Sequence, residues 1–200
     1  MSLFPIETAR LLLRPFVRED LEAFTAYRAD PDVARYQSWS HYTRDDAEAF
    51  YAQQQDLAFN SDDTWFQIAV KRKDDDASLG DLAVHFFDEG RQAEIGVTFA
   101  CEFQRMGYAV EALSRIVELL FDGLGKHRIV ATVDASNRPA QRLFERQGFR
   151  REGEYRKNVF FKGEWSDEYG YALLNEEWRT HAVDGSGSRN RTNPESWKPV

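Results

Sequence analysis

The sequence predicts a single α+β domain built on a mixed sheet with helices on its faces, and two patterns support that prediction. Three β-rich runs, 65–72, 79–87 and 93–100, follow one another through short polar turns, as in an antiparallel meander. A run with helical spacing, 107–121, then leads into a β-branched run at 128–133, so a helix crossover should make this strand parallel to the preceding one. Two hundred residues with 42% hydrophobic content suffice for one such core.

The amino-terminal part predicts a strand followed by two helices. Residues 8–15 form a β-rich run that ends at a proline, and 18–27 carry apolar side chains at helical spacing. Thr43 with Asp46 three residues later resembles a capping box, and an apolar helical face continues to Leu57. We therefore expect a strand, a helix and a second amphipathic helix before the meander begins.

The carboxy-terminal part predicts a helix, a hairpin and a tail. Asn137 should cap a helix that has a proline in its first turn. Two strands, 151–161 and 165–174, should meet as a hairpin at a Lys-Gly-Glu turn. Residues 182–200 are rich in Gly, Ser, Asn, Arg and Pro and lack periodicity, so we expect a folded domain over 1–181 followed by a flexible tail.

Composition and charge narrow the functional classes. The formal net charge of −8 argues against a nucleic-acid binder, which would present a basic surface to phosphates. The single cysteine, Cys101, rules out an internal disulfide, fits a reducing compartment and offers no metal-ligand cluster. No apolar run approaches the roughly 20 residues that cross a bilayer, and the amino terminus lacks a signal-peptide pattern. We therefore expect a cytoplasmic protein without nucleic-acid or membrane partners and without a bound metal.

The most informative segment is the loop between the third meander strand and the longest helix. Gly107 and the small Ala109 would let a bound anion approach the main chain there. The first N–H groups of a helix lack intrahelical partners and carry partial positive charge, so a diphosphate would fit. The alternative, that Gly107 only makes a turn and Ala109 only packs closely, stays open on this spacing alone.

The loop reads Gln104-Arg105-Met106-Gly107-Tyr108-Ala109. This hexapeptide resembles the pyrophosphate loop of the GNAT superfamily of acyl-CoA N-acyltransferases. Segments 134–140 and 143–149 match the same family at the spacing of its asparagine, its following helix and its closing Gly-Phe pair. Segments 8–15 and 153–178 resemble the branch that acetylates the amino termini of ribosomal proteins. The likeness covers about residues 7 to 179, with the blocks in order.

The resemblance implies the GNAT fold, a seven-stranded mixed sheet splayed open between its fourth and fifth strands and flanked by about four helices. Acetyl-CoA, or another acyl-CoA, would lie with its pantetheine arm in that opening. Main-chain groups of the fourth strand would bind the arm, the loop would cradle the pyrophosphate, and the asparagine and the helix after it would flank the cofactor. The residues implied in this binding are Val97, Thr98, Phe99, Arg105, Met106, Gly107, Tyr108, Ala109, Asn137 and Phe144.

The implied reaction is direct attack of a neutral primary amine on the thioester carbonyl, through a tetrahedral oxyanion that a main-chain N–H of the fourth strand stabilises. Glu94 is the first candidate for the base or for a group that orients a water, because related enzymes often place a carboxylate there, and His85 is the second. Each also has a plain structural interpretation. Glu94 fits the solvated face of an alternating strand, and His85 fits a strand residue with a satisfied hydrogen bond.

The acceptor would be a protein amino terminus or a small amine. An α-amine has a pKa of about 8 and is roughly a tenth neutral at pH 7, so it demands little of the base. Three aromatic residues, Tyr36, Trp39 and Tyr42, lie in the link between the first two helices. They fit either the wall of an acceptor cleft or a packed helix junction, and the packed junction is the favoured interpretation.

The sequence departs from the family at the usual general acid. Relatives commonly have Tyr where this chain has Phe144, and the ribosomal branch often has Ser where this chain has Ala140; neither residue can donate a proton. Because a CoA thiol has a pKa of about 8.5, its release as thiolate at pH 7 forgoes only roughly 2 kcal/mol. A regulatory module that binds acyl-CoA without turnover therefore stays open. So do another donor, such as succinyl-CoA, and both a monomer and a homodimer.

Overall fold

The computed structural model describes residues 3–184 of the chain. The strands are β1 (Ile6–Glu7), β2 (Leu11–Pro15), β3 (Thr64–Arg72), β4 (Ser78–Phe87), β5 (Gln92–Phe99), β6 (Arg128–Asp134), β7 (Arg150–Phe161) and β8 (Glu164–Leu174). The α-helices are α1 (Leu21–Ala29), α2 (Pro31–Ala34), α3 (Arg44–Gln54), α4 (Tyr108–Glu118), α5 (Arg138–Arg146) and α6 (Asn175–Asp184). Two 3-10 turns and one π-helical turn complete the set: η1 (Arg18–Asp20), η2 (Cys101–Phe103) and η3 (Leu119–Gly123).

All these strands form one mixed sheet. Its order is β1-β2-β3-β4-β5-β6-β8-β7, and every neighbouring pair is antiparallel except β5 with β6, which are parallel. The expected meander, the parallel crossover through the longest helix and the final hairpin are therefore confirmed. The sheet has eight strands rather than the expected seven, because the two residues of β1 pair with β2 at the edge. A strand of that length is too short to show alternation in the sequence.

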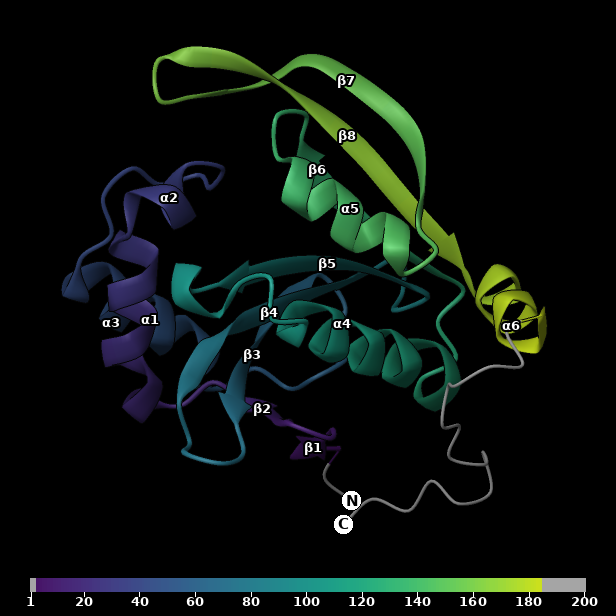
Figure 1. Cartoon of the computed structure of the whole chain (residues 1–200), viewed down its shortest axis with the longest axis horizontal. Coiled ribbons are helices and arrows are strands. Elements are labelled where there is room, and N and C mark those ends of the chain that lie inside the picture. Colours follow the sequence, from purple (N-terminus) through teal and green to yellow (C-terminus); the bar gives the residue numbers. More distant parts are fainter. Residues whose placement is uncertain (1–2, 185–200) are drawn as a thin grey trace.

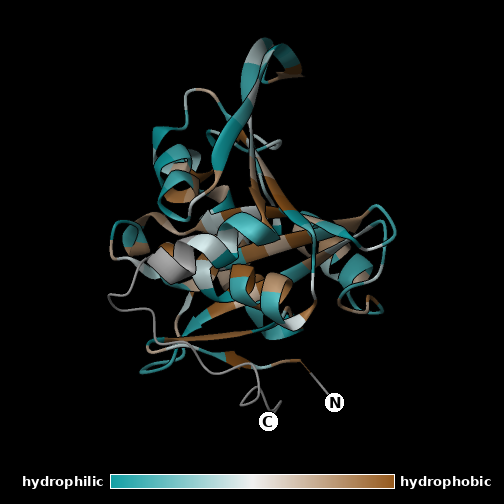
Figure 2. Cartoon of the chain, turned by 90° about the vertical axis from the view of Figure 1, so that its right-hand side faces the viewer, coloured by the Kyte–Doolittle hydropathy of each residue, from teal (hydrophilic) through white to brown (hydrophobic). Residues whose placement is uncertain are grey.

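The helices cover the two faces of the sheet unequally. Figure 1 shows α4 and α5 along one face, α1 to α3 gathered at one end, and the β7–β8 hairpin arching away from the body. Ile116 of α4 packs with Ile95 of β5 and Phe144 of α5 in the main hydrophobic core. A second core joins Phe24 of α1 to Ala69 of β3 on the opposite face. Figure 2 shows hydrophobic residues concentrated in the central strands, with hydrophilic residues outside.

The first strand is shorter than the expected run of 8–15. β2 starts at Leu11, because Thr8 and Arg10 form a turn that binds Glu111 of α4. The Thr8 hydroxyl and the Arg10 main-chain N–H both donate to Glu111 Oε1, at 2.6 and 2.8 Å. A contact with a distant helix thus overrides the local strand propensity of these residues.

The predicted helix caps are confirmed. Thr43 Oγ1 accepts from the main-chain N–H of Asp46, and Asp46 Oδ2 accepts from the Thr43 N–H, which completes the capping box. Asn137 Oδ1 accepts from the N–H of Ala140 at 3.1 Å and so starts α5. The longest helix, expected over 107–121, has α-helical bonding to Glu118 and then the π-helical turn η3.

The carboxy-terminal boundary differs slightly from the expected one at 181. Helix α6 runs to Asp184, so it includes the first residues of the expected tail of 182–200. Residues 185–200 of that tail lie outside the described residues. Within the described range 3–184, no helix is long and apolar enough to cross a membrane.

Candidate functional site

The sheet is split at its centre, where β5 and β6 separate. Their ladder has three residue pairs, of which Glu94 with Val130 is the last, although β5 continues to Phe99 and β6 to Asp134. Across the described sheet the remaining parts of these two strands have no partner on this side. The splayed opening that the family resemblance implied between the fourth and fifth strands is therefore confirmed, between β5 and β6.

Unpaired main-chain groups of β5 face this opening. Ala100 N–H donates to Leu79 C=O, and an antiparallel ladder alternates, so the N–H and C=O of Val97 and Phe99 point away from β4 and towards β6. The Phe99 carbonyl accepts from Gln104 Nε2 at 2.9 Å. By the same alternation, the main-chain N–H and C=O of Thr98 point towards β4. Of the three strand residues implied in cofactor binding, Val97 thus offers its N–H and C=O to the gap, and Phe99 offers its N–H.

The loop after β5 has the geometry of an anion-binding nest. Arg105 has φ of 62° and Gly107 has φ of 82°, so left-handed residues alternate along the loop. Gly107 is the N-cap of α4 and supplies no side-chain cap; over the described residues the N–H groups of Tyr108 and Ala109 have no protein acceptor. Met106 is 53% exposed. The loop therefore presents unpaired donors at the positive end of a helix dipole.

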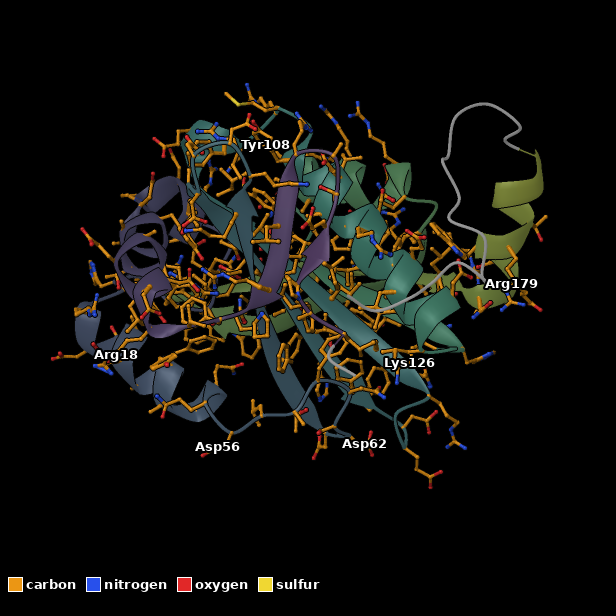
Figure 3. All side chains as sticks on the ribbon, turned by 90° about the horizontal axis from the view of Figure 1, so that it is seen from below. Arg18, Asp56, Asp62, Tyr108, Lys126 and Arg179 are labelled. Carbon is orange, nitrogen blue, oxygen red and sulfur yellow. The ribbon has the colours of Figure 1, made fainter. Side chains whose placement is uncertain are left out.

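Arg10 fixes this loop from the amino-terminal turn. Its Nε donates to Glu111 Oε2 at 2.7 Å, its Nη1 donates to the Met106 carbonyl at 3.1 Å, and its guanidinium lies 4.3 Å from the centre of the Tyr108 ring. Figure 3 shows Tyr108 beside the amino-terminal segment. Partial burial opposes ionisation of Glu111, but hydrogen bonds from Thr8 and Arg10 outweigh it and lower its pKa. Sequence reasoning missed this clasp, whose two partners lie 101 residues apart.

Asn137 and Phe144 take different positions beside the opening. Asn137 uses Oδ1 to cap α5, which leaves its amide NH2 as the available donor. Phe144 is 3% exposed and packs against Phe149 and Tyr171, with ring centroids 5.2 and 6.3 Å away. The Tyr171 hydroxyl donates to Glu145 Oε1 at 3.2 Å. Of these two contacting rings only that of Tyr171 carries a hydroxyl, and Glu145 already accepts its hydrogen bond.

Glu94 lies where the opening narrows to the last β5–β6 pair. Ala93 and Ile95 on either side of it pack in the core under α4, so its side chain points to the opposite face. Thr132 of β6 donates from Oγ1 to Glu94 Oε1 at 3.1 Å, across the opening. Thr132 was not singled out from the sequence, because it lies 38 residues away and carries no local motif. The pair orients a carboxylate at the end of the gap.

His85 is the cross-strand neighbour of Glu94 on the same face. Its ring is nearly parallel to the rings of Trp65 and Phe87, with centroids 4.9 and 5.6 Å apart. Its Nε2 lies 3.6 Å from a carboxylate oxygen of Asp63. The structure thus brings both candidate bases together and holds His85 in an aromatic cluster.

A small cavity lies farther along the same face. Its volume is about 190 Å³, and it is lined by the residues that follow α2, the end of β6 and the tip of the β7–β8 hairpin, including Tyr36, Asp134 and Trp165. Ser136 and Ser166 donate hydroxyl hydrogen bonds to the Asp134 carboxylate. Partial burial opposes ionisation of Asp134, but these hydrogen bonds outweigh it and lower its pKa. A larger cavity of about 640 Å³ lies between β2, β3 and α3, away from the opening.

The aromatic residues between α1 and α3 have two kinds of surroundings, a helix junction and a cavity wall. Trp39 Nε1 donates to the Arg28 carbonyl at 2.9 Å, and the Trp39 ring lies 5.4 Å from that of Tyr42. The Arg28 guanidinium lies over both rings, so these two residues pack the helix junction. Tyr36 lines the 190 Å³ cavity instead.

Cys101 lies near two carboxylates, which the sequence did not indicate. Ligand atoms of Asp30, Asp32 and Cys101 lie within 4.8 Å of one another, the closest approach to a metal-ligand group within residues 3–184. Desolvation, then the charge of Asp30, raises the pKa of the thiol. The Asp32 main-chain N–H occupies Asp30 Oδ1. Cys101 is exposed, and within residues 3–184 the buried side-chain N or O atom without a partner is Arg28 Nε.

A split sheet, an anion-binding nest ahead of the longest helix and a carboxylate at the end of the split are the features expected of an acyl-CoA-dependent N-acyltransferase. Comparison with known proteins agrees with this class. The family model described as "Acetyltransferase (GNAT) domain" matches residues 10–150. The chain belongs to the GNAT acetyltransferase family and is an acyl-CoA-dependent N-acyltransferase.

Two relatives and one solved structure show how similar this chain is to individual members of the family. It is 36% identical over 173 residues to the N-acetyltransferase YnaD of Bacillus subtilis, covering 86% of this chain and 98% of that one. It is 32% identical over 105 residues to the ribosomal N-acetyltransferase-like protein YdaF of the same organism, covering 52% of this chain and 57% of that one. A solved GNAT acetyltransferase from Bacillus anthracis superposes with a TM-score of 0.78 at 32% identity, covering 86% and 98%. The predicted family and fold are confirmed.

Proposed function

We propose that the protein transfers an acetyl group from acetyl-CoA to a primary amine. The observation that carries this proposal is the joint position of the β5–β6 opening and Glu94. The unpaired groups of Val97 and Phe99 line the opening, and the Glu94 carboxylate stands where it closes, on the face opposite α4. The pantetheine arm of the donor on one side of the opening and the amine on the other side would then meet beside Glu94.

Two parts of the chain fit the donor. Val97 and Phe99 would hydrogen-bond the amide groups of the pantetheine arm, as an added strand would. The N–H groups from Gly107 to Ala109 would receive the diphosphate, and Arg10 keeps that loop in its left-handed conformation. When bound, acetyl-CoA supplies the acyl group as a thioester. Asn137 would donate from its amide nitrogen, and the core behind Phe144 would support the α5 side of the arm.

The residues of this chain would handle the proton and the oxyanion. Glu94, held by Thr132, takes the proton that the amine loses as its nitrogen bonds to the carbonyl carbon. The Val97 N–H faces the gap and donates to the developing oxyanion. The C–S bond then breaks, and the sulfur leaves as a thiolate that takes its proton from water, because Phe144 and Ala140 carry no hydroxyl.

The acceptor would be a primary amine, and a protein amino terminus is one candidate class. The resemblance to the ribosomal branch favours it, and so does the low demand that an α-amine makes on the base. Asp134 follows Thr132 by two residues, so the 190 Å³ cavity shares the face of Glu94 and has room for the body of an acceptor. The expected cytoplasmic location stays a prediction, as does the choice between monomer and homodimer.

The test is a screen of donors against acceptors, read as free thiol released. Purified protein is mixed with acetyl-CoA or succinyl-CoA and with amino-terminal peptides, polyamines or aminoglycosides, and the acylated product is identified by mass spectrometry. We expect thiol release with acetyl-CoA above the no-amine blank for at least one acceptor class. Tight CoA binding with no thiol release for any amine would instead favour the regulatory acyl-CoA-binding role that Phe144 and Ala140 leave open.

A further inference from the structure

Three rings form an open aromatic cluster on the acceptor face of the sheet. Trp65, His85 and Phe87 come from β3 and β4, and their planes differ by 13° and 21° about the central imidazole. Trp65 is 44% exposed, one of the large hydrophobic side chains in the described chain that remain at the surface. An exposed aromatic cluster beside a reactive carboxylate is a common mark of a ligand contact.

The strand register places this cluster directly beside Glu94. Trp65 pairs with His85, and His85 pairs with Glu94, so the three side chains form one row across β3, β4 and β5. His85 and Glu94 are a hydrogen-bonded pair of the ladder, whose Cα atoms are about 5.5 Å apart. Helices α1 and α3 pack on this face around Ala69 and Ala100, and Gln54 at the end of α3 donates a hydrogen bond to the Trp65 carbonyl at 3.2 Å. The row from Glu94 to Trp65 is partly open to solvent, with the His85 side chain 21% exposed and Trp65 44% exposed.

We propose that the ring cluster is an acceptor subsite for a flat aromatic group carried two or three bonds from the reacting nitrogen. The preferred acceptors would be arylalkylamines, or peptides whose first residue is aromatic. With the amine at Glu94, a ring at that distance falls over His85 and Phe87, within the 4.5–7 Å at which aromatic pairs associate. This inference rests on the proposed function, because it takes Glu94 as the point where the amine binds.

The chemistry of the cluster favours a neutral ring over a second cation. The ring nearest Glu94 is an imidazole, which can itself carry positive charge and would then repel an ammonium group. A carboxylate oxygen of Asp63 lies 3.6 Å from the imidazole Nε2, so this acidic group already faces His85. An uncharged ring stacks on either form of the imidazole and also covers part of the exposed Trp65 surface.

The test compares phenethylamine, butylamine and 1,4-diaminobutane as acceptors with saturating acetyl-CoA. We expect kcat/KM for phenethylamine to exceed that for butylamine about tenfold, the ratio that one good aromatic contact supplies. Trp65→Ala and Phe87→Ala should each reduce that ratio several-fold while kcat/KM for butylamine changes little. Tyr155→Ala is the matched control, because Tyr155 is 47% exposed on β7, away from the row, and its loss should leave the ratio unchanged.

Several outcomes would overturn the subsite: equal use of phenethylamine and butylamine, preference for the diamine, or a ratio unaffected by Trp65→Ala and Phe87→Ala. Failure of the proposed function has a different signature, which is absence of thiol release with every amine. Calorimetric titration of phenethylamine and butylamine into the CoA-loaded protein still decides the subsite in that case. Tighter binding of phenethylamine that weakens in Trp65→Ala supports it, and equal or undetectable binding of both amines rejects it.

Discussion

Two polar regions on the same sheet are built in opposite ways. Beneath α1 the carboxylate of Asp81, 2% exposed, accepts hydrogen bonds from Tyr27, Arg28 and Gln67. The Arg28 guanidinium also lies over the rings of neighbouring aromatic residues, and its Nε is the buried side-chain N or O atom that lacks a partner among residues 3–184. At the β5–β6 opening, by contrast, the main-chain groups of Val97 have no protein partner across the gap.

The contrast separates polar groups that stabilise the fold from polar groups left for a ligand. Burying an unpaired polar group costs free energy, so the Asp81 cluster is closed by its own neighbours. The main-chain groups at the opening and in the loop can stay without a protein partner because water can hydrogen-bond to them until a ligand displaces it. Removing a partner should therefore damage the fold in the first region and the binding or chemistry in the second.

The largest effect is expected from Asp81→Ala. Burial raises the pKa of Asp81 while Arg28 opposes that shift, and loss of the carboxylate leaves a buried guanidinium without its counter-ion. Breaking a buried ion pair from one side costs about 3–5 kcal/mol, so the free energy of unfolding in urea should fall by that much. Asp75→Ala, which removes an exposed ion pair with Arg72, is the control and should change it little. Equal effects of the two substitutions would contradict this account.

Gly107→Glu should abolish binding at the opening while leaving the fold in place. The residue has φ of 82°, a new side-chain carbon would lie 3.4 Å from Arg10 Nη2, and the carboxylate would repel a diphosphate. We expect Kd for CoA to rise at least about 100-fold by calorimetry. Gly125→Glu has the same kind of backbone strain, with φ of 65° and no neighbour within 4 Å, and should retain wild-type affinity. Retained affinity in Gly107→Glu would show that the phosphate cradle lies elsewhere.

Glu94→Gln should lower kcat without weakening CoA binding. General-base groups contribute about 10²–10⁴-fold, and the loss should be greatest for amines that are almost fully protonated. At pH 7 a lysine-like amine is below roughly 0.1% neutral and an α-amine roughly a tenth neutral, so the variant should discriminate against the lysine-like amine more strongly than the wild type does. Glu89→Gln, in the turn before β5, serves as control. Unchanged kcat for both amines would remove Glu94 from the mechanism.

The smallest effect is expected from Phe144→Tyr. The substitution restores the hydroxyl common in the family at a position that is 3% exposed beside Phe149 and Tyr171. Because protonation of the leaving thiolate is worth only roughly 2 kcal/mol at pH 7, we expect kcat to rise by a factor of about 2–10. Ala140→Ser tests the alternative position of the ribosomal branch. No gain in either variant, with unfolding unchanged, would mean that water is an adequate acid here.

Local patterns in the sequence predicted most of the elements but not the contacts that complete the site. Capping at Thr43 and Asn137 involves residues three apart, so the sequence carries a direct signal for it. The clasp of Arg10 on Glu111 and the hydrogen bond from Thr132 to Glu94 each join distant segments, and no spacing rule connects them. The short helix α2 was also missed, because four residues are too few to show a period.

The opening itself could be predicted only through the family resemblance. Periodicity indicates which residues form β5 and β6, but not at which residue two strands stop pairing. The same limit applies to Thr98, which the resemblance groups with Val97 and Phe99: the register turns its main-chain groups towards β4, and its part in cofactor binding stays a prediction. Assigning each N–H to one side of a strand needs the register, and only the folded chain supplies it.

The seam between β5 and β6 has three residue pairs, fewer than any other ladder of the described sheet except the two-pair ladder of β1 with β2 at its edge. A pantetheine arm bound to Val97 and Phe99 would lengthen that seam, and so would act as a temporary strand as well as a carrier of the acyl group. Release of the product would then leave β5 and β6 joined by their three residue pairs alone. The strength of the connection between the two halves of the sheet would therefore change with the stage of the reaction.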